Sequence, residues 1–99
     1  MKNIRIGQKE IIHFIGIGGI GMSGLAQVMK TMGFNIQGSD QNKNKSTSNC
    51  SKAGIKVFTG HSKKNIKNVT IVVKSSAIKN NNVEIKQARI KHPPPLLKL

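Results

Sequence analysis

The most informative segment of the chain, residues 11–21, reads Ile11-Ile12-His13-Phe14-Ile15-Gly16-Ile17-Gly18-Gly19-Ile20-Gly21. A short apolar run rich in β-branched residues and bounded by glycine is typical of a buried parallel strand. The glycines then match Gly-x-Gly-x-x-Gly at Gly16, Gly18 and Gly21. Between a strand and a helix, this pattern indicates a phosphate-binding loop of a Rossmann-like fold.

The rest of the chain continues the alternation of strands and helices. From Met22 the apolar residues take helical spacing, which predicts a helix over residues 20–32 that ends before Gly33. Further strands are predicted over 34–38, 55–58 and 70–73, helices over 47–53 and 82–91, and a turn over 63–67 that Ser62 caps. The pattern therefore predicts an α/β fold, a Rossmann-like parallel sheet of about four strands with flanking helices.

The two ends of the chain do not fit this alternation. Residues 1–10 form a polar lead-in, residues 11–91 the Rossmann-like domain, and residues 92–99 an irregular proline-rich tail. Pro93, Pro94 and Pro95 lack the N–H donors that a strand needs, so we expect the sheet to be incomplete at its C-terminus. Its open edge would favour self-association.

Composition and charge exclude several classes of protein. The net charge of +14, with 17 basic and three acidic residues, favours nucleic acid as a partner. However, the lysines are scattered, only Arg5 and Arg89 are arginine, and neither Trp nor Tyr occurs, which disfavours base readout and stacking. A single cysteine, Cys50, excludes an intrachain disulfide and a cysteine-based metal cluster. No apolar run is long enough to span a membrane, so we expect a cytoplasmic protein with neither nucleic acid nor membrane as a partner.

Each glycine of the loop has an expected role in holding an anion. Gly16 would allow the tight turn, Gly18 would let the backbone approach a pyrophosphate, and Gly21 would let helix and sheet pack closely. The free N–H groups at the helix start would face the anion. Asp40, 19 residues after Gly21, is placed to accept from sugar hydroxyls. Its charge disfavours a 2′-phosphate, so NAD or a UDP-type ligand is expected before NADP.

The segment after the loop adds a more specific signal. Met22-Ser23-Gly24-Leu25-Ala26 extends the glycine motif, and Gly38-Ser39-Asp40, Gly60-His61 and Ser75-Ser76-Ala77-Ile78 follow it in order. Together these segments resemble the Mur ligases, the amide-forming enzymes of peptidoglycan synthesis, over about residues 11–90. They are more similar to the branch that adds L-alanine to UDP-N-acetylmuramate than to the murein-peptide branch.

The resemblance implies a binding site for UDP-N-acetylmuramate. The diphosphate would lie on the loop residues Gly16, Gly18, Gly19, Ile20, Gly21, Met22, Ser23 and Gly24. The uridine and ribose would lie against Ser39, Asp40, His61, Ser75, Ser76 and Ala77. No residue of the chain is expected to be catalytic or to bind a metal.

The chain also departs from the family pattern. It contains no Gly-x-x-x-x-Gly-Lys-Ser/Thr segment, so ATP and magnesium are expected only for the full-length ligase. We therefore expect a truncated piece, cut at its C-terminal side, that binds the nucleotide sugar but does not form the amide bond. Two alternatives stay open: an NAD-binding Rossmann domain of an oxidoreductase or sensor, and a small basic nucleic-acid-binding protein.

Overall fold

The computed structural model describes residues 9–90 and 95–99, in which strands alternate with helices. The elements are β1 (Ile11–Ile15), α1 (Ile20–Thr31), β2 (Asn35–Asp40), α2 (Lys45–Lys52), β3 (Lys56–Thr59), the 3-10 helix η1 (Lys63–Ile66), β4 (Ile71–Lys74), α3 (Val83–Ile90) and β5 (Leu96–Lys98). The strands form one parallel sheet in the order β3-β2-β1-β4-β5. The predicted α/β fold is confirmed.

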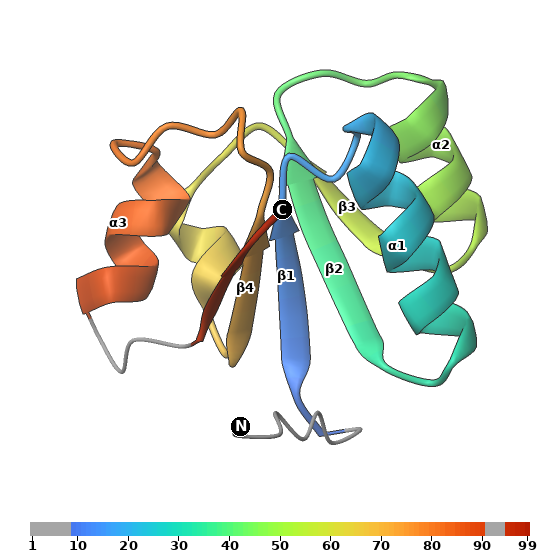
Figure 1. The fold of residues 1–99 in the computed structure, drawn as a ribbon, viewed down its shortest axis with the longest axis horizontal. Helices are drawn as coiled ribbons and strands as arrows, with labels where there is room; N and C mark the ends of the chain where they lie inside the picture. Colours follow the sequence, from blue (N-terminus) through green and yellow to red (C-terminus); the bar gives the residue numbers. More distant parts are fainter. Residues whose placement is uncertain (1–8, 91–94) are drawn as a thin grey trace.

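Helices cover both faces of the sheet. Figure 1 shows α1 and α2 together on one side, and α3 with η1 on the other. All strands are parallel, but the chain adds β2 and β3 on one side of β1 and then β4 and β5 on the other. The strand order therefore has a switch point at β1. Ligands of open parallel sheets bind outside the carboxyl ends of the strands at such a switch point. The fold therefore places the glycine loop, which follows β1, at the expected binding position.

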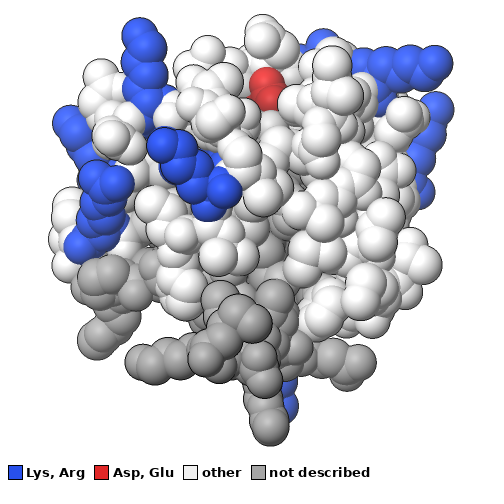
Figure 2. Space-filling view, viewed as in Figure 1, with Lys and Arg blue, Asp and Glu red and all other residues white. Residues whose placement is uncertain are grey.

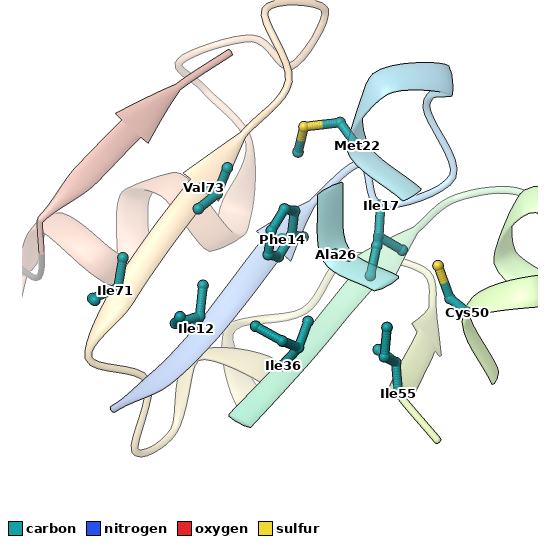
Figure 3. Close-up of a cluster of buried hydrophobic side chains, with 10 residues drawn as sticks. All are labelled: Ile12, Phe14, Ile17, Met22, Ala26, Ile36, Cys50, Ile55, Ile71 and Val73. Atoms are coloured by element: carbon teal, nitrogen blue, oxygen red, sulfur yellow. The ribbon is translucent and has the colours of Figure 1, made fainter. Parts of the chain in front are cut away.

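Alternate residues of the central strands build two separate cores. Ile12 and Phe14 of β1 point to the side of α1 and α2. There they belong to the cluster of buried side chains labelled in Figure 3, which also includes Ile36 and Val73. Ile15 and Val72 point to the other side, where Ile66, Ile85 and Ala88 complete a smaller cluster. Cys50 belongs to the larger core and has no exposed surface. Burial raises the pKa of its thiol.

Glycines end two of the helices as predicted. Gly33 follows α1 with a φ of +97°, and Gly54 follows α2 with a φ of +88°. Both values lie in the left-handed region that ends helices and that glycine adopts without strain. The start of α2 lies two residues before the predicted one, because Asn44 and Thr47 form a capping box. Ser62 caps η1 by accepting from the Lys64 N–H, as predicted.

The prediction of an irregular tail is wrong for residues 96–98, which form β5 and pair in parallel with β4. Pro95 does not prevent this pairing because it precedes the strand, a position where a missing N–H costs no ladder hydrogen bond. Pro95 still contributes its carbonyl, which accepts from the Val72 N–H at 2.9 Å. The sheet thus has five strands. Residues 1–8 of the predicted lead-in and residues 91–94 lie outside the described part of the chain.

Basic side chains lie at several separate places on the face seen in Figure 2. Figure 2 shows lysine and arginine around the rim of one face, with uncharged atoms across most of its centre.

Apolar side chains are also exposed on α1: Leu25, Val28 and Met32 are 37%, 57% and 63% exposed. The predicted apolar stripe of α1 is therefore only partly buried, with Met22 and Ala26 on its core side. No helix of residues 9–90 and 95–99 has the length and apolarity needed to cross a membrane.

Candidate functional site

A cleft of about 720 Å³ opens beside the carboxyl ends of β1, β2 and β4. Its volume lies in the range of small-molecule sites, about 300–1,000 Å³. Four of the predicted site residues line it, namely Gly16, Asp40, His61 and Ala77. The remaining lining residues are Gln41, Asn42, Gly60, Ile78, Lys79, Asn81, Asn82 and Val83.

The glycine loop is held against the end of β2. Gly16 has a φ of +84°, which confirms that it makes the tight turn out of β1. The N–H groups of Gly16 and Ile17 both donate to the carbonyl of Ser39, at 2.8 and 3.0 Å. Gly19 N–H then donates to the carbonyl of Gly16 at 3.0 Å. The loop therefore has a fixed shape before any ligand arrives.

The first turn of α1 has unpaired backbone donors. Gly19 is the N-cap residue and has no side chain to cap the helix. Ser23 N–H is the first to bond to a carbonyl of the helix, that of Gly19. The N–H groups of Ile20, Gly21 and Met22 precede it and have no intrahelical partner. Such a helix start attracts anions through its N–H groups and its dipole.

Gly18 lies against Asp40 rather than facing open space. Its N–H donates to Asp40 Oδ2 at 2.8 Å. A Cβ at this position would meet Asp40 Oδ2 at 2.8 Å and Thr47 Cγ2 at 2.9 Å. Packing inside the chain therefore favours a glycine here, independently of any pyrophosphate, because the side chains of Asp40 and Thr47 would have to shift for a Cβ. The other oxygen of Asp40 accepts from the Asn42 N–H at 3.1 Å, and each oxygen keeps capacity for a further donor.

The close-packing role expected of Gly21 is wrong. A Cβ there would meet nothing within 4 Å, because the residue lies on the exposed side of α1. The close approach occurs instead at Gly38 of β2. A Cβ at Gly38 would lie 2.5 Å from Ile17 Cδ1 and 2.9 Å from the Phe14 carbonyl oxygen. Gly38 therefore lets the loop after β1 pack onto the sheet.

Ser39 lies behind the cleft wall, and His61 lies on it. Ser39 has no exposed surface, and its hydroxyl is 2.9 Å from Nδ1 of His61. The Ser39 side chain is therefore not free to touch a ligand, although the carbonyl of the same residue anchors the glycine loop.

The segment after β4 forms another wall of the cleft. Ser75 N–H donates to the Ile15 carbonyl at 3.2 Å, and Ser76 N–H donates to the Leu99 carbonyl at 2.7 Å. Of residues 75–77, only Ala77 lines the cleft. The buried ammonium of Lys74 holds the following turn by donating to the Ile78 carbonyl at 2.7 Å. The wall is thus fixed from two sides.

The most important residue that the sequence analysis missed is Glu84, in the first turn of α3. Its side chain is fully buried and accepts from four donors: Ser39 Oγ, His13 Nε2, Asn65 Nδ2 and the Ser62 N–H. Burial raises the pKa of Glu84, but the hydrogen bonds that it accepts from His13, Ser39 and Asn65 outweigh burial, and its pKa lies at about 2. The sequence spacing of these residues gives no signal of their convergence.

The polar lining residues were also missed. Gln41 and Asn42 follow β2, while Lys79, Asn81 and Asn82 lie between β4 and α3. Their position after strands that end at the cleft was a signal that could have found them.

Among residues 9–90 and 95–99, no group of three or more His, Cys, Asp or Glu side chains is placed to hold a metal ion.

Residues 11–94 match the protein family described as "Mur ligase family, catalytic domain". The chain belongs to the Mur ligase family. This Mur ligase chain is 58% identical over 91 residues to the UDP-N-acetylmuramate–L-alanine ligase of Pelagibacter ubique, covering 92% of the chain and 20% of that relative. It is 57% identical to the enzyme of the same name from Rickettsia typhi, covering 78% of the chain and 16% of the relative.

Solved structures of Mur ligases have the same fold. The UDP-N-acetylmuramate–alanine ligase of Thermotoga maritima matches with a TM-score of 0.84 and 36% identity, covering 89% of this chain and 20% of that one. The UDP-N-acetylmuramate:L-alanyl-γ-D-glutamyl-meso-diaminopimelate ligase of Neisseria meningitides matches with a TM-score of 0.77 and 26% identity, covering 90% and 28%. This Mur ligase chain thus spans about a fifth of the length of the curated relatives it matches.

Proposed function

We propose that the chain is the part of a UDP-N-acetylmuramate–L-alanine ligase that binds UDP-N-acetylmuramate. The observation that carries the proposal is the convergence of Gly16, Asp40, His61 and Ala77 on one cleft at the carboxyl ends of parallel strands. The relatives that carry this substrate in their names are 57% and 58% identical to the chain. This identity supports the alanine-adding branch.

The diphosphate is assigned to the glycine loop and the start of α1. The N–H groups of Ile20, Gly21 and Met22 supply donors for its oxygens. Gly19, the N-cap residue, has no side chain that could block these donors. Ser23 and Gly24 follow these donors inside α1. Asp40 accepts from the hydroxyls of the ribose, and His61 contacts the same nucleoside. Ala77 lies in the wall that encloses it, and the backbone of Ser75 and Ser76 holds that wall in place.

Amide-bond formation is assigned to the whole ligase, with ATP and magnesium held outside this chain. The support is the sequence, which has no Gly-x-x-x-x-Gly-Lys-Ser/Thr segment to cradle the phosphates of ATP. The chain by itself therefore binds the substrate and presents it.

Thermal unfolding of the 99-residue chain with UDP-N-acetylmuramate, UDP and NAD tests the proposal. A ligand at 100 times its dissociation constant adds about 2.7 kcal/mol to the free energy of unfolding. We expect the UDP-sugar to raise the melting temperature most, UDP less, and NAD not at all. Stabilisation by NAD without stabilisation by the UDP-sugar would make the chain a nicotinamide-binding domain instead.

A matched pair of variants locates the site. Gly21→Val adds a side chain next to the free N–H groups of α1, where a Cβ meets nothing within 4 Å, so the fold should persist. We expect it to remove the UDP-sugar shift. Thr31→Val places the same side chain at the far end of α1, on its exposed surface, and should keep the shift. Equal binding by both variants would contradict the assignment of the diphosphate to this helix start.

A further inference from the structure

The hydrogen bonds around Glu84 have a direction that the chemistry of the groups determines. Glu84 is ionised at neutral pH, because the Ser62 N–H and Asn65 Nδ2 both donate to Oε2 and its hydrogen bonds hold its pKa below the ordinary value. An ionised carboxylate can only accept hydrogen bonds. The Ser39 hydroxyl, whose oxygen lies 2.6 Å from Oε1, therefore donates its single proton to Glu84. Only acceptor capacity is left on Ser39 Oγ.

The ring of His61 uses that remaining capacity. Its Nδ1 lies 2.9 Å from Ser39 Oγ. Since Ser39 has no second proton to give, Nδ1 of His61 must carry a hydrogen and donate it. A neutral imidazole has one N–H, so Nε2 of His61 is then an acceptor. Nδ1 is also 3.7 Å from Glu84 Oε1, a neighbour that favours an N–H over a lone pair.

The direction of the hydrogen bond between His13 and Glu84 follows from a separate contact, and it agrees with an ionised Glu84. Gln37 Nε2 donates to the Asn65 carbonyl at 2.8 Å, which decides which end of the amide faces His13. The same nitrogen lies 2.8 Å from Nδ1 of His13 and donates to it. The other nitrogen of His13 therefore carries the hydrogen and donates to Glu84 Oε1 at 2.7 Å. The hydrogens of Ser39 Oγ and His13 Nε2 thus both point toward the carboxylate.

The second nitrogen of His61 opens to the cleft. His61 lines the cleft, and its side chain is 7% exposed. Across the described residues, no buried side-chain nitrogen or oxygen lacks a hydrogen-bond partner. Nδ1 has its partner in Ser39, and no partner of Nε2 lies in residues 9–90 and 95–99, which leaves Nε2 for a ligand in the cleft that the ring lines. It is the polar atom that the ring presents to a ligand.

We propose that Glu84 and Ser39 are positioning residues that hold His61 with its hydrogen on Nδ1, so that Nε2 offers the cleft a hydrogen-bond acceptor. The opposite tautomer would set two lone pairs against each other at Ser39 and His61, which costs a buried hydrogen bond. For the ligand, the inference rests on the proposed function. It assigns an N–H or O–H of the nucleoside, rather than a phosphate oxygen, to this position.

The ¹⁵N spectrum of the imidazole rings in the ligand-free wild-type chain tests the tautomer directly. At neutral pH we expect Nδ1 of His61 to give the shift of a protonated nitrogen and Nε2 that of an unprotonated one. His13 should show the reverse pattern. A spectrum in which His61 carries its hydrogen on Nε2 overturns the proposal, and no variant is needed for this result.

Two serine variants separate positioning from general stability. Ser39→Ala removes the link between Glu84 and His61, so His61 should populate both tautomers and UDP-sugar affinity should fall about tenfold. Ser62→Ala removes a hydroxyl that caps η1 but keeps the backbone N–H that binds Glu84. It should change neither the tautomer nor the affinity. An unchanged His61 spectrum in folded Ser39→Ala overturns the positioning role.

Two UDP analogues identify the donor on the ligand. N3-methyl-UDP lacks the imide N–H of the base, and 2′,3′-dideoxy-UDP lacks both ribose hydroxyls. We expect one of them to lose about tenfold in affinity against UDP in the wild-type chain and much less in Ser39→Ala. Equal affinities for all three would overturn the donor assignment. If UDP does not bind at all, the proposed function fails, whereas the tautomer is still decided by the spectrum of the free chain.

Discussion

Gly38 is the glycine whose missing side chain matters most for stability. A Cβ there would lie 2.5 Å from Ile17 Cδ1 and 2.7 Å from Ile17 Cβ, inside the larger core. Overpacking of this kind typically costs about 1–3 kcal/mol. We therefore expect Gly38→Ala to lower the free energy of unfolding by at least that amount, as measured by urea denaturation.

Gly24→Ala is the matched control, because a Cβ at this exposed helical position meets nothing within 4 Å. Replacing glycine by alanine inside a helix should stabilise the chain by about 0.5–1 kcal/mol. If both substitutions had the same effect, close packing at Gly38 would not be needed for the fold.

Single residues also show where prediction from the sequence ends. The loop glycines were found because their pattern is local, and the left-handed φ of Gly16 confirms the predicted turn. The roles of Gly21 and Gly38 were not found, since they depend on which backbone segments approach one another in space. Glu84 was missed for the same reason: its donors come from β1, β2 and the segment around η1.

At the scale of elements, the stability of α2 depends on its N-terminal cap. Asn44 Oδ1 accepts from the Thr47 N–H, and Thr47 Oγ1 accepts from the Asn44 N–H, both at 2.9 Å. Loss of such a cap costs about 1 kcal/mol. We expect Asn44→Ala to lower the free energy of unfolding by this amount in urea denaturation.

Asn49→Ala provides the comparison within the same helix, because Asn49 is exposed and lies inside α2. Alanine has the higher helix propensity, so this variant should be neutral or slightly stabilising. A cost at Asn49 equal to that at Asn44 would mean that the capping box adds no specific stability.

Most elements could be predicted because their signals are periodic apolar residues and terminal glycines. The early start of α2 was missed because Thr47 stands where a capping box usually has Glu or Gln. The strand β5 was missed because prolines precede it and it has only three residues. Its pairing comes from the free edge of β4, which is a property of the sheet and not of the tail's own sequence.

For the whole molecule, acid stability depends on one carboxyl group. The chain has three acidic residues, and Glu84 is the one with no exposed surface. Its pKa lies at about 2 in the folded chain, against an ordinary value of 4.5. A lowered folded-state pKa contributes stability that is complete above the unfolded-state value and is lost as the pH falls. We expect the free energy of unfolding to drop by about 3 kcal/mol between pH 5 and pH 2.

Chemical denaturation at a series of pH values measures this loss. Glu84→Gln should be less stable than wild type at pH 7 and should show little change over the same acid range. Glu10→Gln, outside the Glu84 network, should keep the wild-type dependence. Wild-type stability that stays constant from pH 5 to pH 2 would contradict an ionised, hydrogen-bonded Glu84.

The pairing of β5 also links two distant parts of the chain. Leu99 accepts from the N–H of Ser76 and donates to the carbonyl of Lys74, so the edge strand holds the segment that continues into Ala77 at the cleft. Thermodynamic linkage between two such sites is reciprocal. If binding in the cleft and docking on β5 are coupled through these hydrogen bonds, each changes the affinity of the other by the same factor. A residue that touches no ligand can in this way act as an effector site.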